Sequence, residues 1–164
     1  MKINSTAFTD RGPIPPQYTC EGSGISPALR WEEIPKGTKS LALIADDPDA
    51  PAGTWVHWLV YNIPPDAKTL PQGVPTLESL PHRVLQGKNS FHKIGYGAPC
   101  PPPGHGPHRY FFRLYALDTL LDIRPGVDRR ELEEAMKGCI LGRAELMGRF
   151  ERQAMRDRKK NALD

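Results

Sequence analysis

The chain has 164 residues with a formal net charge of +3 at neutral pH, and 18 of its residues are proline. This length favours one domain with a core that needs no cross-links, and the small charge argues against a nucleic-acid-binding protein. No apolar run resembles a signal peptide or reaches the ~18 residues that cross a bilayer, so we expect a soluble protein. The many prolines predict short elements joined by stiff loops.

Three cysteines, Cys20, Cys100 and Cys139, are odd in number and widely spaced. No pair has the spacing of a zinc finger. The simplest interpretation is reduced thiols in a cytoplasmic protein, and a bridge between Cys20 and Cys100 is the alternative.

Three segments have the pattern of β-strands. Ser40–Ala45 is a continuous apolar run, which indicates a strand buried on both faces. Trp55–Ile63 is rich in aromatic and β-branched residues and ends before two prolines. His108–Leu117 alternates, so that Tyr110 and Phe112 share one face while Arg109 lies on the other.

One helix follows, over residues 128–141. Asp128 and Glu131 have the spacing of a capping box, and apolar residues recur at helical spacing up to Ile140. Gly142 is the expected helix stop, and 144–150 is a closing strand. Residues 1–152 therefore form a single, mainly antiparallel β domain with a late helix. The charged tail, 153–164, is expected to be frayed or a short helix.

Polar side chains gather where the first two strands meet. Asp46, Asp47 and Asp49 lie between prolines, and His57 follows between two tryptophans. Without further information the aspartates are interpreted as turn and capping groups, and His57 as a satisfied core histidine. On an extended chain Asp46 points opposite to Asp47.

A second polar loop, 95–110, leads into the third strand. His108 and Tyr110 would project together from that strand. Spacing alone does not establish that this loop meets the first. His105, His108 and Cys100 together could suggest a metal, but they lack a standard zinc spacing and we expect none.

Several motifs, in order along the chain, resemble the phosphatidylethanolamine-binding protein family, also called Raf kinase inhibitor proteins, in its bacterial and archaeal branch. They are "IPPQYTCEG" (14–22), "ISPALRW" (25–31), "DDPDAP" (46–51), "HWLVYNIP" (57–64), "GYGAPCPP" (95–102), "HRYFFRLYALD" (108–118) and "AELMGRF" (144–150). Ala98 departs from the family pattern, which has glycine there, and its Cβ could narrow the loop.

The resemblance implies a large antiparallel sheet packed on a smaller one with a peripheral helix. It also implies a non-enzymatic module, without a cofactor, that binds phosphate-like anions such as phospholipid head groups or phosphorylated side chains. Such modules inhibit a kinase or a serine protease, and their pairing into homodimers is open here. Carried over by motif, the ligand-binding residues are Asp47, Asp49, Trp55, His57, Pro102, His108 and Tyr110.

Since carboxylates do not bind anions, we expect Asp47 to accept a hydrogen bond from His57 or His108 and to favour the protonated ring. The imidazoles and Tyr110 would donate to the anion, whose affinity would then fall as pH rises. Asp49 could instead hold loop N–H groups. Ala50–Pro51, in a tight turn, is a candidate cis bond.

Two rival functions remain. A phosphoesterase could use His57 and His108 with Asp47 as the orienting group, although the motifs contain no nucleophile elbow or phosphate loop. A serine protease inhibitor could instead act through an exposed loop, independently of the anion pocket.

Overall fold

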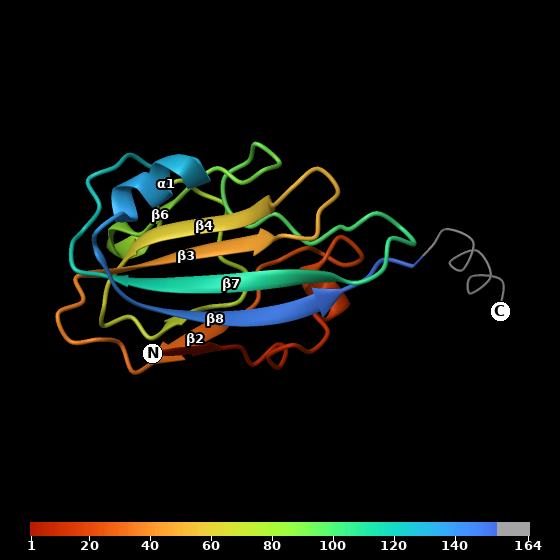
Figure 1. The fold of residues 1–164 in the computed structure, drawn as a ribbon, viewed down its shortest axis with the longest axis horizontal. Coiled ribbons are helices and arrows are strands. Elements are labelled where there is room, and N and C mark those ends of the chain that lie inside the picture. The colour runs from red at the N-terminus through yellow and green to blue at the C-terminus, as the bar shows by residue number, and fades with distance from the viewer. Residues whose placement is uncertain (154–164) are drawn as a thin grey trace.

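Two antiparallel sheets and the helix α1 make up the computed structural model, which describes residues 1–153 (Figure 1). The five-stranded sheet has the order β6-β4-β3-β7-β8, and the three-stranded sheet has the order β1-β2-β5. This arrangement confirms the fold that the resemblance implied. The elements are β1 (Lys2–Asn4), β2 (Leu29–Glu32), β3 (Ser40–Asp47), β4 (Trp55–Ile63), β5 (Thr69–Leu70), β6 (Leu85–Gln86), β7 (His108–Leu117), α1 (Arg129–Met136) and β8 (Ile140–Phe150).

The three predicted strands form the centre of the large sheet. β4 and β7 have the predicted bounds, and β3 runs two residues further than predicted, to Asp47. β3 pairs with β4 on one side and β7 on the other, and each of its residues is buried. A continuous apolar run suits this position because layers cover both faces of the strand.

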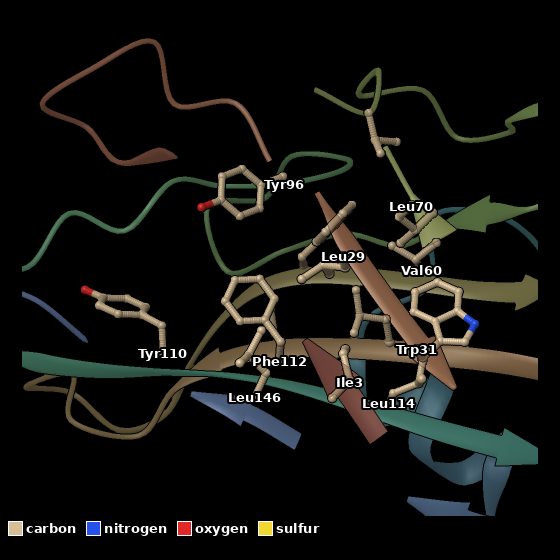
Figure 2. Close-up of a cluster of buried hydrophobic side chains, with 14 of the residues drawn as sticks. Ile3, Leu29, Trp31, Val60, Leu70, Tyr96, Tyr110, Phe112, Leu114 and Leu146 are labelled. Carbon is tan, nitrogen blue, oxygen red and sulfur yellow. The ribbon is translucent and has the colours of Figure 1, made fainter. Parts of the chain in front are cut away.

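The main core lies between the two sheets. Phe112 and Leu114 of β7 face the small sheet, where they meet Ile3 and Trp31. Figure 2 shows these side chains gathered between β7 and the short strands β1 and β2. Because the side chains of β7 alternate, its other face carries arginines and aromatic rings instead.

The helix covers part of the opposite face, with Leu132 and Met136 buried against the large sheet. Its capping box is present, since Asp128 accepts from the backbone of Glu131. The predicted helix end was wrong, because α1 stops at Met136. A turn at Gly138, whose φ is +80°, leads directly into β8, where Ile140 pairs with β7.

Asp46 is not the turn or capping group that we predicted. Its side chain is buried on the helix side of β3, where it forms ion pairs with Arg113 (3.2 Å) and with Arg129 (2.8 Å). Arg113 lies on β7 and Arg129 begins α1. One carboxylate therefore fastens the helix to two strands of the sheet. The expectation that it points opposite to Asp47 holds.

The cysteine prediction was also wrong. Cys20 and Cys100 form a disulfide across a sequence separation of 80 residues, and Cys139 is free. Cys20 also donates its backbone N–H to Pro99, so two loops are joined twice at one point. The argument from reduced thiols to a cytoplasmic location loses its premise, and that location stays a prediction.

The predicted charged tail, 153–164, lies outside the described residues apart from Gln153. Across residues 1–153, we find no helix with the length and apolar character that membrane crossing requires.

We predict that Asp46→Ala lowers the free energy of unfolding by about 1–3 kcal/mol. This is less than the ~3–5 kcal/mol for fully buried pairs, because Asp46 is 2% exposed but both arginines are 28% exposed. Glu145, a 52% exposed partner of Arg113, provides the control, and Glu145→Ala should cost under about 1 kcal/mol. Urea unfolding measures both, and equal losses would contradict the anchoring role of Asp46.

Candidate functional site: a polar pocket at one end of the large sheet

A pocket of about 210 Å³ lies where the ends of three strands meet. Asp47 ends β3 and pairs in register with Trp55, which begins β4, while the neighbouring Asp46 pairs with Phe111 of β7. The loop between β3 and β4 and the loop that precedes β7 consequently lie at the same end of the sheet (Figure 1). Every predicted site residue except Asp49 lines this pocket; they are Asp47, Trp55, His57, Pro102, His108 and Tyr110.

Asp47 and His108 form the buried centre of the site. His108 Nδ1 lies 2.7 Å from Asp47 Oδ2, and the two side chains are 2% and 4% exposed. An ionised carboxylate only accepts hydrogen bonds, so Nδ1 carries the proton and Nε2 is the remaining nitrogen. Of the two histidines that we expected as partners of Asp47, the one that contacts it is therefore His108. The other oxygen of Asp47 accepts the backbone N–H of Asp49 at 2.8 Å.

His105 contacts the same histidine from the exposed loop. Its Nδ1 lies 2.6 Å from His108 Nε2, which makes a chain of three polar groups from Asp47 to the surface. We had considered His105 only as a metal ligand. An exposed histidine in a glycine-rich loop follows no periodic pattern, so this contact could not be predicted from residue spacing.

His57 is held by the backbone instead of by Asp47. Its Nδ1 lies 2.6 Å from the carbonyl oxygen of Gly97, and its own carbonyl accepts the N–H of Gly97 at 2.7 Å. Since a carbonyl only accepts, Nδ1 is protonated. Burial lowers the pKa of His57, which favours the neutral ring with an unprotonated Nε2. Gly97 is required here because a Cβ would lie 2.5 Å from the ring of Phe91.

Two buried donors beside the pocket have no hydrogen-bond partner within residues 1–153. They are the indole N–H of Trp55 and the hydroxyl of Tyr110. Burial raises the pKa of Tyr110, and the nearby Asp47 carboxylate raises it further through its charge and a weak interaction that falls outside hydrogen-bond geometry, so the hydroxyl remains a donor. Figure 2 shows this hydroxyl pointing away from Phe112 and the apolar core. Unpaired buried donors are costly and rare, and they indicate a place for an acceptor.

Asp49 lies outside the pocket, on the outer side of the first loop. It accepts the backbone N–H of Arg109 at 2.9 Å and pairs with the guanidinium of the same residue. The hydrogen bond from the Arg109 side chain is the main reason why the pKa of Asp49 is lowered. Asp49 thus fastens the first loop to the start of β7, in keeping with the alternative that it holds N–H groups. The predicted cis bond at Ala50–Pro51 was wrong, because the bond is trans.

Phe91 is a pocket residue that sequence analysis missed. Its ring centroid lies 5.4 Å from that of Trp55 and 5.6 Å from that of His57, so it forms an apolar wall. Cys100 lines the same pocket, and its disulfide with Cys20 ties this part of the lining to the loop that contains Cys20. Ala98 lies outside the pocket, in a neighbouring hollow, and its Cβ does not narrow the site.

Metal binding has no support in the part of the chain that the structure describes. Residues 1–153 contain no group of three or more histidine, cysteine, aspartate or glutamate side chains placed to hold an ion. Asp47, His108 and His105 form a chain of hydrogen bonds and not a ligand set.

Comparisons with known proteins agree on one family. The family model described as phosphatidylethanolamine-binding protein matches residues 4–151. A UPF0098 protein of Methanothermobacter thermautotrophicus is 52% identical over 93% of this chain and 99% of its own length. A UPF0098 protein of Pyrococcus abyssi is 49% identical over 93% of this chain and 86% of its own.

Two crystal structures have the same fold. A putative phosphatidylethanolamine-binding protein homologue from Chlamydia trachomatis is 43% identical, with a TM-score of 0.84 over 93% of this chain and 97% of that one. E. coli YbcL, described as a member of the mammalian family, is 31% identical, with a TM-score of 0.85 over 92% of this chain and 97% of that one. The chain belongs to the phosphatidylethanolamine-binding protein family.

Proposed function

We propose that this protein binds a phosphate-like anion in the pocket and does not turn it over. One observation carries the proposal: the pocket is lined by two side chains, Trp55 and Tyr110, whose buried donors lack an acceptor within the described residues. A phosphoryl or sulfate oxygen would satisfy both. Charge-assisted hydrogen bonds of this kind are about twice as strong as neutral ones.

The two histidines would complete the site. His57 and His108 are each protonated at Nδ1 by their contacts with Gly97 and Asp47. Nε2 of His57 is left for a ligand, whereas Nε2 of His108 is hydrogen-bonded to His105 and would reach a ligand only if His105 moved away. A proton taken up at Nε2 turns the ring of His57 into a donor for the anion, and the negative charge of Asp47 would stabilise a positive charge on His108. The carboxylate therefore acts on its histidine and not on the ligand.

The size of the pocket supports a small anionic group as the ligand. A volume of about 210 Å³ is below the ~300–1,000 Å³ typical of sites for drug-sized molecules. A phospholipid head group and a phosphorylated side chain share such a group, and both fit the chemistry of the site. The apolar walls, Phe91 and the prolines, would keep water away from these bonds.

We also propose that the partner is a kinase or a serine protease, as the family resemblance implies, and that the pocket takes part in the contact. Incubation of a panel of such enzymes with the protein, with and without saturating phosphate, tests this point. Inhibition that phosphate does not relieve would place the contact on an exposed loop instead.

A hydrolase is the second candidate, because an aspartate that orients a buried histidine is also the arrangement of a general base. The lining residues argue against it. Within residues 1–153 they include no serine or threonine, and their cysteine is in a disulfide, so a covalent nucleophile would have to be Asp47, a histidine or Tyr110.

We predict that Tyr110→Phe weakens sulfate binding at least about tenfold, as expected for the loss of a ~1.5–3 kcal/mol hydrogen bond to a charged group. Its stability should not fall, because the hydroxyl has no partner within residues 1–153. Tyr96→Phe is the matched control, since the Tyr96 hydroxyl donates to the carbonyl of Tyr18 at 2.6 Å. That variant should lose stability and keep its sulfate affinity. Calorimetry and urea unfolding measure the two effects, and unchanged binding by Tyr110→Phe would contradict the proposal.

Sulfate affinity should fall as pH rises from about 5 to 8. In the ligand-free protein, burial lowers the pKa of His57 below the ordinary histidine value of 6.5. A bound anion favours the protonated ring and therefore raises this pKa again. Affinity is therefore highest below this lowered pKa and decreases as the pH passes it, by up to about tenfold per pH unit for each proton taken up on binding. Sulfate keeps its charge over this range, so the change reports on the protein.

Calorimetry of His57→Gln should give a flatter profile, while His82→Gln, at an exposed histidine outside the pocket, should keep the wild-type profile. A wild-type affinity that is independent of pH would rule out protonated imidazole as a donor.

Release of p-nitrophenol from p-nitrophenyl phosphate and its bis-ester should not exceed the buffer rate. The physical reason is the lack of a hydroxyl or thiol nucleophile among the lining residues other than the phenol of Tyr110. Turnover that disappears in both His57→Ala and His108→Ala would overturn the binding-only function and establish the hydrolase.

A further inference from the structure

The pocket poses an electrostatic problem for an anion. Among residues 1–153, no lysine or arginine lines the pocket, and the pocket contains the carboxylate of Asp47. The imidazole of His57 is biased toward its neutral form by burial. An anion in this place would need a permanent positive charge from just beyond the lining side chains.

Arg152 is held against the rim of the pocket, which we define as residues 101–107. Its Nε donates to the carbonyl of Pro101 at 2.8 Å, and Pro101 is a buried lining residue. The backbone carbonyl of Arg152 accepts the N–H of Gly104 at 3.2 Å. Two bonds from one residue therefore fix the guanidinium beside this segment, two residues after β8 ends at Phe150.

The charge of Arg152 reaches the pocket. It acts on the hydroxyl of Tyr110 to lower its pKa, against the larger effects of burial and of Asp47 that raise it. Within residues 1–153, no carboxylate forms an ion pair with Arg152. Arg109, in contrast, is paired with Asp49.

We propose that Arg152 is a further residue of the anion site and supplies its permanent positive charge. This inference rests on the proposed function, since it assumes that the pocket holds an anion. The guanidinium keeps its charge at any physiological pH, whereas the histidines need to take up a proton. Arg152 would therefore allow the site to hold an anion at a pH where the imidazoles are neutral.

The test uses Arg152→Gln, with Arg149→Gln as a matched control. Arg149 is an exposed arginine three residues earlier whose Nε also donates to a backbone carbonyl, that of Arg11, at 2.8 Å. Calorimetry with sulfate at about pH 8, above the ~6.5 reference pKa of histidine, isolates the contribution of the Arg152 charge to sulfate affinity. Arg152→Gln should weaken binding about tenfold, the low end for a charge-assisted contact, and Arg149→Gln less than about twofold.

Salt dependence separates charge from structure. The difference between wild type and Arg152→Gln should shrink as KCl is raised toward ~1 M, where the Debye length falls to about 3 Å. Arg152→Lys, which keeps the charge, should recover most of the affinity at low salt.

Each other outcome has a definite meaning. A loss that is the same at every salt concentration, or that Arg152→Lys does not recover, would overturn the charge assignment and leave Arg152 a structural clamp. Wild-type sulfate binding that Arg152→Gln leaves unchanged overturns this inference alone. Absence of sulfate and phosphate binding to wild type overturns the proposed function, and this inference with it.

Discussion

The hydrogen bond between Asp47 and His108 is the contact on which the rest of the site depends. It joins the last residue of β3 to the first residue of β7 at 2.7 Å in a nearly dry environment. There an unpaired carboxylate would be costly, so each group stabilises the placement of the other. The bond also fixes the tautomer of His108, whose Nε2 then contacts Nδ1 of His105 at 2.6 Å.

Two neighbouring aspartates show how a β-strand separates structure from function. Side chains of β3 alternate, so Asp46 lies on the helix side and pairs with Arg113 and Arg129, while Asp47 lies on the pocket side. The first fastens α1 to the sheet. The second orients a histidine in a site that the helix does not touch. A shift of one residue in register would exchange these roles and disrupt both.

The strands were predictable because their patterns are local. Continuous apolar sequence in β3 and alternation in β7 report burial directly, and the bounds of β4 and β7 were correct. The end of α1 was not predictable in this way, because Ile140 follows the helical spacing yet is taken by pairing with Leu117. The Cys20–Cys100 bridge joins residues 80 apart, a distance over which local pattern gives no information.

The candidate site also combines features that the sequence motifs predict with contacts that they do not predict. The motifs named six of the residues that line the pocket but not Phe91. They could not choose between His57 and His108 as the partner of Asp47, or show that Asp49 turns away to Arg109. Contacts such as that of His105 depend on how irregular loops meet across the fold, and residue spacing does not encode them.

The most direct test is a crystal structure of the protein with sulfate or phosphate at saturating concentration. We expect one anion in the pocket, with oxygen atoms about 2.7–3.2 Å from the hydroxyl of Tyr110 and the indole nitrogen of Trp55. A pocket that holds only water under these conditions, or an anion bound solely elsewhere on the surface, would contradict it.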